Sequence, residues 1–217
     1  MPVLPRHALP FAPKGATIGL FGGSFDPAHA GHVQVTQHGL RLLALDQLWW
    51  LVSPGNPLKA HGPAPLEVRL AQSRRLMQHP RVQVTPVEGA LGTRYTADTL
   101  RELTRRYIGR RFVWIMGADN LANFHRWESW RVIMQMLPVA VVARPGEQLR
   151  ALSSVAARSY AAARLPAHDA ARLGRMQAPA WCFLTVPMCD LSSSRLRAEG
   201  AWQGQPESPT RPNASQD

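Results

Sequence analysis

The sequence contains little cysteine and almost no lysine. Only Cys182 and Cys189 occur among its 217 residues, and their spacing matches neither a disulfide framework nor a zinc-ligand pattern. We therefore expect two free thiols. Just two of the 25 basic residues, Lys14 and Lys59, are lysine. A lysine inside a structured segment thus marks a place where a compact point charge has a role.

Long hydrophobic runs are also absent. The longest apolar neighbourhood, residues 132–143, is interrupted by Gln135 and Pro138, so the sequence predicts no membrane span. The first 15 residues lack an apolar stretch followed by a small-residue cleavage site, and we expect no signal peptide. A cytoplasmic location is the expectation that follows.

Acidic residues are too few to balance the basic ones. The chain has 25 Lys and Arg against 14 Asp and Glu, a formal net charge of +11. Such a charge suggests a basic RNA-binding protein as one class of function. The arginines are dispersed, however, in short pairs at 74–75, 105–106 and 110–111, and no RNA-binding signature occurs. We expect a solvated surface and no nucleic-acid partner.

Apolar runs alternate with segments of helical period along the chain. The expected strands are 17–21, 48–52, 81–85, 112–116, 139–143 and 181–186, and the expected helices are 31–45, 66–78, 97–108, 121–136 and 148–173. Mostly apolar strands separated by helix-length segments are typical of a parallel sheet buried on both faces. The sequence predicts an α/β, doubly wound, Rossmann-like fold, which binds ligands beyond the carboxyl ends of its strands.

The predicted organisation is a single domain over residues 17–200. Residues 1–16 form an N-terminal extension, and 201–217 are expected to be a disordered tail, because their composition offers almost nothing to pack. The segment 147–178 matches no functional motif.

The stretch GGSFDPAHAGH, residues 22–32, follows the first expected strand. It is neither a G-x-G-x-x-G fingerprint nor a Walker P-loop. Gly22 and Gly23 permit close approach to the backbone, and a helix beginning near Ala30 offers free N–H groups to an anion. His29 and His32 lie on one side of its first turn and can donate hydrogen bonds to phosphate. Alternatively, they are a helix cap with a surface histidine, or a metal pair.

A second polar stretch, LSSSRLR at residues 191–197, follows the last expected strand. Ser192 can cap a short helix, while Ser193 and Ser194 can offer hydroxyl and N–H groups to phosphate. Arg197, one turn further on, can reach the same anion. A serine-rich stretch of this kind is otherwise more typical of a loop.

Together these stretches resemble the two signatures of the nucleotidyltransferase superfamily, H-x-G-H and I-S-S-T-x-I-R. The segments RYTADTL (94–100), MGADNLANFHRW (116–127) and VVARPG (141–146) further resemble nicotinate-nucleotide adenylyltransferases, from about Thr17 to Glu199. One departure is the SPGNPLK loop, which is more compact than the P-x-x-x-P-P-H-K form of many relatives.

The resemblance implies a role for each motif residue. The catalytic group is His29, His32, Lys59 and Arg197; the ATP-binding group is Gly22, Gly23, Ser24, Phe25, Gly117, Asp119, Arg144, Ser193 and Ser194; the group for nicotinate nucleotide is Asp26, Tyr95, Thr96 and Trp127. Trp127 would stack on the nicotinate ring, and Asp119 would contact the adenosine ribose. Without the resemblance, Asp119 and Thr96 read as helix caps, Trp127 as a core residue, and Arg144 as a turn residue.

The implied reaction is adenylyl transfer from ATP to nicotinate mononucleotide, giving deamido-NAD and pyrophosphate. Mg²⁺ would be held mainly by the ATP phosphates and water, because no carboxylate cluster is apparent and we expect no protein metal site. Nicotinamide mononucleotide and phosphopantetheine are alternative acceptors. The sequence leaves open whether the chain is a monomer or a homo-oligomer.

Overall fold

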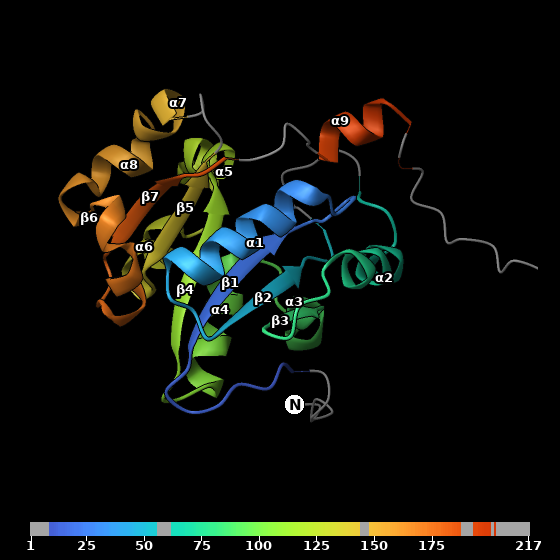
Figure 1. The fold of residues 1–217 in the computed structure, drawn as a ribbon, viewed down its shortest axis with the longest axis horizontal. Coiled ribbons are helices and arrows are strands. Elements are labelled where there is room, and N and C mark those ends of the chain that lie inside the picture. The colour runs from blue at the N-terminus through green and yellow to red at the C-terminus, as the bar shows by residue number, and fades with distance from the viewer. Residues whose placement is uncertain (1–8, 56–61, 144–147, 188–192, 201, 203–217) are drawn as a thin grey trace, which may run out of the picture.

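The computed structural model describes residues 9–55, 62–143, 148–187, 193–200 and 202. Within them a 7-stranded sheet has the spatial order β3-β2-β1-β4-β5-β7-β6, and every pairing is parallel. The strands are β1 (Thr17–Gly23), β2 (Gln47–Val52), β3 (Val82–Thr85), β4 (Arg111–Gly117), β5 (Val139–Ala143), β6 (Arg164–Leu165) and β7 (Trp181–Thr185). Helices cover both faces (Figure 1), so the predicted α/β, doubly wound class is confirmed.

The helices connect successive strands. They are α1 (Ala30–Leu42), α2 (Leu66–Leu76), α3 (Val87–Leu91), α4 (Thr96–Arg106), α5 (Ala118–Asn123), α6 (Trp130–Met136), α7 (Gln148–Leu152), α8 (Val155–Ser159) and α9 (Ser193–Ala198), with 3-10 turns η2 (Phe124–Arg126), η3 (Ala161–Ala163) and η4 (Ala167–Arg175). In the described part of the chain, none of them combines the length and apolarity needed to cross a bilayer.

Two hydrophobic cores lie on opposite faces of the sheet. Alternate residues of β4 show the division, because Phe112 and Trp114 join one core while Val113 and Ile115 join the other. The first core packs against α3 to α8, and the second against α1, α2 and η4. Burial on both faces explains why these strands read as almost continuous apolar runs.

The strand order reverses direction at β1, which pairs with β2 on one side and β4 on the other. The connection from β1 runs through α1 to β2, whereas β4 and the later strands extend the sheet the other way. A crevice therefore opens beyond the carboxyl ends of β1 and β4, where open α/β sheets bind their ligands.

The expected helix at 121–136 was wrong as a single element. It is divided into α5, η2 and α6. The helical turn η2 ends where Trp127 is extended, and Ser129, left-handed with φ of 53°, stands as the N-cap of a separate helix, α6. The division changes the place of Trp127. It lies on the extended residue after η2 instead of on a helix face.

The expected helix at 148–173 was also wrong. Ser154 caps a new helix, α8, by accepting a hydrogen bond from the Ala157 backbone N–H. Pro166, which has no N–H, then separates the short strand β6 from η4. The extra strand β6 pairs with β7 at the sheet edge, where two residues leave almost no signal in a sequence.

Candidate active site

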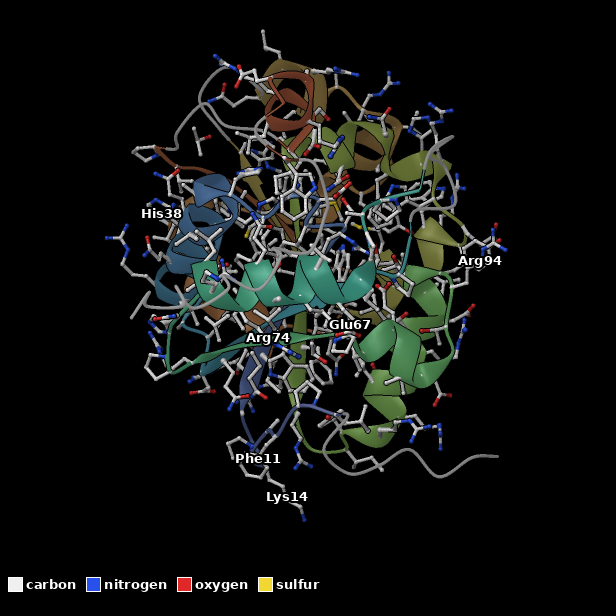
Figure 2. The ribbon with its side chains drawn as sticks, turned by 90° about the vertical axis from the view of Figure 1, so that its right-hand side faces the viewer. Phe11, Lys14, His38, Glu67, Arg74 and Arg94 are labelled. Carbon is white, nitrogen blue, oxygen red and sulfur yellow. The ribbon has the colours of Figure 1, made fainter. Side chains whose placement is uncertain are left out.

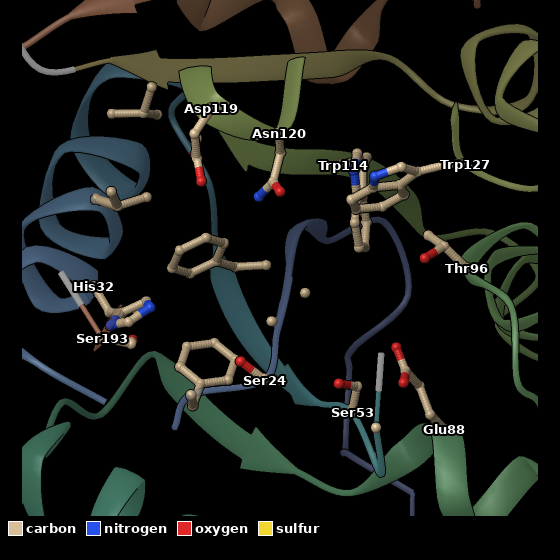
Figure 3. A pocket seen from close by; sticks show the side chains of 18 of the residues that line it. Ser24, His32, Ser53, Glu88, Thr96, Trp114, Asp119, Asn120, Trp127 and Ser193 are labelled. Carbon is tan, nitrogen blue, oxygen red and sulfur yellow. The ribbon is translucent and has the colours of Figure 1, made fainter. Parts of the chain in front are cut away.

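A cavity of about 940 Å³ opens at the carboxyl ends of β1 and β4 (Figure 3). Most of the residues that the sequence singled out line it. They are Gly22, Gly23, Ser24, Phe25, His29, His32, Tyr95, Thr96, Gly117, Asp119, Trp127, Ser193 and Ser194. Two signatures that are more than 150 residues apart in the chain therefore meet at one cavity.

His29 and His32 form the N-terminus of α1 and cap it reciprocally. The Nδ1 of His29 accepts the Gly31 N–H at 3.1 Å, and the Nδ1 of His32 accepts the His29 N–H at 3.2 Å. A neutral imidazole whose Nδ1 accepts a hydrogen bond carries its hydrogen on Nε2. The helix cap thus makes Nε2 the donor of both rings, so the capping and phosphate-binding interpretations of this pair are compatible.

An aromatic cluster behind His32 fixes the position of its ring. Phe25 is buried and stacks on Trp50 with ring centroids 4.6 Å apart, and the His32 ring lies 4.9 Å from Phe25. The Trp50 indole N–H donates to the Thr36 hydroxyl, which in turn donates to the His32 carbonyl. Side chain and backbone of His32 are therefore both held before any ligand arrives.

Gly22 and Gly117 are glycine for reasons of space. A Cβ on Gly22 would lie 2.3 Å from the Trp114 ring, and one on Gly117 would lie 2.5 Å from the Asp119 carboxylate. The first glycine lets Trp114 form part of the cavity wall, and the second lets the Asp119 side chain turn back toward the cavity. The close approach is made by protein side chains here, which the sequence did not reveal.

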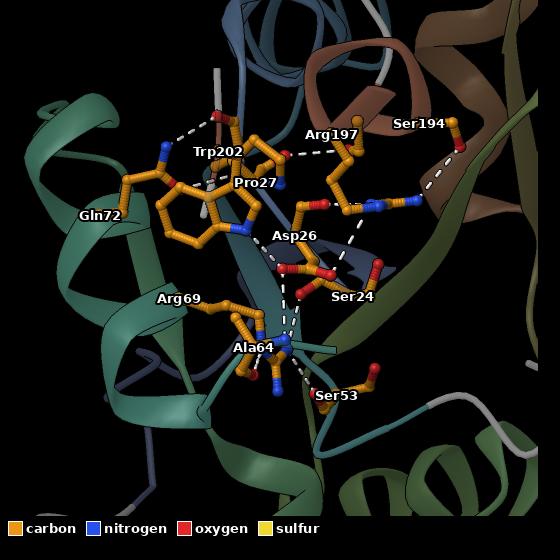
Figure 4. Close-up of polar contacts among 12 residues, drawn as sticks. Ser24, Asp26, Pro27, Ser53, Ala64, Arg69, Gln72, Ser194, Arg197 and Trp202 are labelled. Atoms are coloured by element: carbon orange, nitrogen blue, oxygen red, sulfur yellow. Dashed lines mark hydrogen bonds and ion pairs between the residues drawn. The ribbon is translucent and has the colours of Figure 1, made fainter. Parts of the chain in front are cut away.

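The second signature, on α9, is attached directly to the first (Figure 4). The Ser193 hydroxyl donates to the Pro27 carbonyl at 2.9 Å, and the Arg197 guanidinium donates to the Asp26 carbonyl. A second contact joins Arg197 to the Asp26 carboxylate at 3.7 Å. The Asp26 carboxylate also accepts the Trp202 indole N–H at 2.7 Å. Asp26 and Arg197 do not line the cavity; they join its two signatures.

A buried arginine that sequence reasoning missed supports the same region. Arg69 of α2 has 0% exposure and donates to the carbonyls of Ser24, Ser53, Pro54 and Ala64. Burial lowers the pKa of its guanidinium, and the nearby Asp26 charge opposes that shift. Because Arg69 joins the chain after β1 to the chain after β2, it positions Ser24 and Ser53, which both line the cavity. In a sequence with 25 basic residues, nothing distinguished it.

The opposite end of the cavity is built from α3, α4 and the segment around Trp127. Trp127 is half-buried and packs edge to face against Phe124 and Trp114, while Trp130 is buried in the core. Tyr95 is the residue before α4, and neither it nor Thr96 caps the helix through its side chain. Thr96 and Asp119 therefore do not serve as the helix caps that their positions suggested.

Comparison with known proteins gives the family. Residues 20–199 match the model of the Cytidylyltransferase-like family. A probable nicotinate-nucleotide adenylyltransferase of Cereibacter sphaeroides is 64% identical over 188 residues, which cover 87% of this chain and 98% of that protein. The chain belongs to the nicotinate-nucleotide adenylyltransferase family. A Ruegeria pomeroyi protein of the same name is 58% identical, over 91% of this chain and 92% of its own length.

The solved structures agree on the fold. The nicotinic acid mononucleotide adenylyltransferase of Plasmodium falciparum, complexed with NaAD, gives a TM-score of 0.65 at 15% identity, covering 84% of this chain and 83% of that chain. The chain therefore shares its fold with a protein of very different sequence.

Two predicted site residues, Lys59 and Arg144, lie outside the described residues. The other lysine, Lys14, lies near Phe11 on the surface, and His38, Arg74 and Arg94 project from separate elements (Figure 2).

Burial raises the pKa of the Cys182 thiol to about 12, so this cysteine stays protonated. Among the residues that the structure describes, no group of three or more His, Cys, Asp or Glu side chains could hold a metal ion.

Proposed function

We propose that this chain joins nicotinate mononucleotide to the adenylyl group of ATP, releasing pyrophosphate and forming deamido-NAD. The observation that carries the proposal is the meeting of both signatures at one cavity, with His29 and His32 at a helix N-terminus. Relatives that are 58% and 64% identical bear the name of this enzyme. The reaction belongs to the biosynthesis of NAD.

The end of the cavity near α1 would bind the ATP phosphates. The two imidazole Nε2–H groups offer hydrogen bonds to the triphosphate, and the positive end of the α1 dipole favours its negative charge. Ser194 adds a hydroxyl group from the other signature, whereas Ser193, whose hydroxyl donates to the Pro27 carbonyl, would contribute its backbone N–H. These donors need not be reorganised, because His29 and His32 are held by their own cap.

The bond changes require positioning more than a reactive side chain. A 5′-phosphate oxygen of nicotinate mononucleotide attacks the α-phosphorus of ATP, and a new P–O–P bond forms. The bond from the α-phosphorus to the bridging oxygen breaks, and pyrophosphate leaves with that electron pair toward the histidines. Fixed donors stabilise the charge that develops on the leaving group.

The nucleotide would arrive as its Mg²⁺ complex. Phosphate oxygens and water would hold this cation, since Mg²⁺ is usually bound through substrate phosphates and retains several waters. That cation would supply charge neutralisation on the phosphates. We expect the enzyme to act in the cytoplasm, as a monomer or a homo-oligomer.

The decisive test is release of pyrophosphate from ATP and Mg²⁺. Nicotinate mononucleotide, nicotinamide mononucleotide and phosphopantetheine are supplied separately, and rates are compared at equal concentration. We expect release with nicotinate mononucleotide to exceed the others strongly. Equal rates for the two pyridine nucleotides would disprove the proposed selectivity, and no release with any acceptor would disprove the reaction.

A further inference from the structure

We propose that Glu88 is the counter-ion for the positively charged pyridinium ring of the nucleotide acceptor. The inference rests on the proposed function, because it assigns a residue to the acceptor's ring. Glu88 lies on α3 and lines the same cavity as Tyr95, Thr96 and Trp127 (Figure 3). Glu88 belongs to none of the sequence motifs described above.

The Glu88 side chain is mostly buried, but its carboxyl oxygens are not among the fully buried, unpartnered atoms of the described residues, so they are open to the cavity. Its relative exposure is 8%, yet no donor or cation among the described residues contacts its carboxyl group. Most buried carboxylates in proteins are paired or hydrogen-bonded, because an isolated buried charge is costly. A carboxyl group that faces a cavity in this state is therefore suited to receive its partner from a ligand.

The backbone of Glu88 is held firmly while its side chain is left unpaired. Its carbonyl accepts hydrogen bonds from the Thr93 N–H at 3.1 Å and from the Thr93 hydroxyl at 3.3 Å. The Gly92 N–H, at the left-handed end of α3, also points to that carbonyl. Thr93 in turn contacts the Thr99 hydroxyl of α4 at 2.8 Å. The carboxyl group is thus presented to the cavity from a fixed platform.

The chemistry of the two substrates indicates what this carboxyl group contacts. ATP and the 5′-phosphate of the acceptor are anionic, and so is the carboxylate of nicotinate, so all three would repel an ionised Glu88. The N-ribosyl pyridinium ring is the cationic part of the acceptor. A buried carboxylate beside this ring would gain a strong, poorly screened attraction. A ring stacked on Trp127 would bring its charge into this end of the cavity.

Burial raises the pKa of the Glu88 carboxyl group to about 7. Binding of the cationic ring would lower this pKa and so favour the ionised form of Glu88. The other titratable or charged side chains that line the cavity are His29, His32, Arg94, Tyr95, Asp119, Arg126 and Glu128. Their presence means that pH dependence has to be compared between variants and not in the wild type alone.

The test compares Glu88→Gln with wild type for two ligands that differ in ring charge. Nicotinate mononucleotide has the pyridinium ring, and its 1,4-dihydro form has a neutral ring with the same ribose and phosphate. Dissociation constants are measured by calorimetry at pH 8, without ATP. We expect Glu88→Gln to weaken binding of the pyridinium form about tenfold or more, the scale of one unit of differential protonation. Binding of the dihydro form should change less than about twofold, and Glu67→Gln, an exposed glutamate on α2, should alter neither.

A pH series gives a second readout. The ratio of wild-type to Glu88→Gln affinity for the pyridinium form should rise about tenfold between pH 6 and 8, as a group with a pKa near 7 ionises. A flat ratio would overturn the proposal. Equal losses for both ligands would also overturn it, since they would indicate contact with the ribose. Binding is measured without turnover, so it can be separated from the reaction. A wild-type protein that binds nicotinate mononucleotide but releases no pyrophosphate would disprove the proposed reaction and leave the proposed role of Glu88 to be judged by the binding data.

Discussion

The two ends of the cavity are built differently. At the phosphate end the polar groups are already engaged with the protein: the histidines cap α1, and Arg69 donates to four carbonyls. At the pyridine end, Glu88 is buried with no described partner and Trp127 lies half-buried on the wall. In the proposed function, the end near α1 is preorganised for the phosphate charge of a nucleotide, and the end that holds Glu88 is completed by the ring of the acceptor.

Removing Arg69, which supports the end of the cavity near α1, should have the largest effect on stability. Arg69→Met leaves the carbonyls of Ser24, Ser53, Pro54 and Ala64 without their donor, and we expect the free energy of unfolding to fall by about 3–5 kcal/mol. Denaturant unfolding measures this, with exposed Arg74→Met on the same helix as the control.

Arg69→Met could abolish folding altogether, so Arg69→Lys provides a second measurement. Lysine keeps the charge but lacks the planar fork of donors. We expect intermediate stability together with a lower turnover, because Ser24 and Ser53 lose their fixed positions. A Lys variant with wild-type stability and turnover would contradict the positioning role.

Removing one donor of the phosphate end comes next. His32→Ala should lower turnover by about 10²-fold or more, the scale for loss of a preorganised donor to the transition state. Steady-state pyrophosphate release measures it, with His38→Ala, further along α1, as the control. Full activity in His32→Ala would remove His32 from the site.

At the end of the cavity that holds Glu88, we expect a substitution to stabilise the ligand-free protein, whereas removal of Arg69 destabilises it. The pKa of Glu88 rises from 4.5 to about 7 on folding, so the folded protein binds more protons between these values. Stability therefore falls as pH rises from about 4.5 to about 7. Glu88→Gln should make the ligand-free protein about 3 kcal/mol more stable at pH 8. Thermal unfolding at pH 8 and pH 4 tests this, and the gain should vanish at the lower pH.

The smallest effect is expected where the chain near its C-terminus contacts the first signature. Trp202→Phe removes the indole N–H that donates to Asp26 and should lower the free energy of unfolding by about 1 kcal/mol. Turnover should change less than about twofold, because Asp26 does not line the cavity. A large loss of turnover with unchanged stability would place Asp26 in the substrate site.

The difference between the two ends also explains which residues sequence reasoning could find. The phosphate end uses local motifs: the glycines, His29 and His32 follow one strand within eleven residues, and the short spacing itself carries the signal. Glu88 and Arg69 stand in ordinary amphipathic segments. Their burial depends on how α3 packs on β2 and how α2 packs on β2 and β3, which no local pattern reveals.

By itself the sequence determined the α/β class, most of the strands and both signatures, because apolar runs and turn residues act over a few neighbouring positions. It did not determine that Asp26 and Arg197 pair with each other or that Glu88 faces the cavity. Those outcomes were decided by the tertiary structure, since each depends on contacts between segments far apart in the chain.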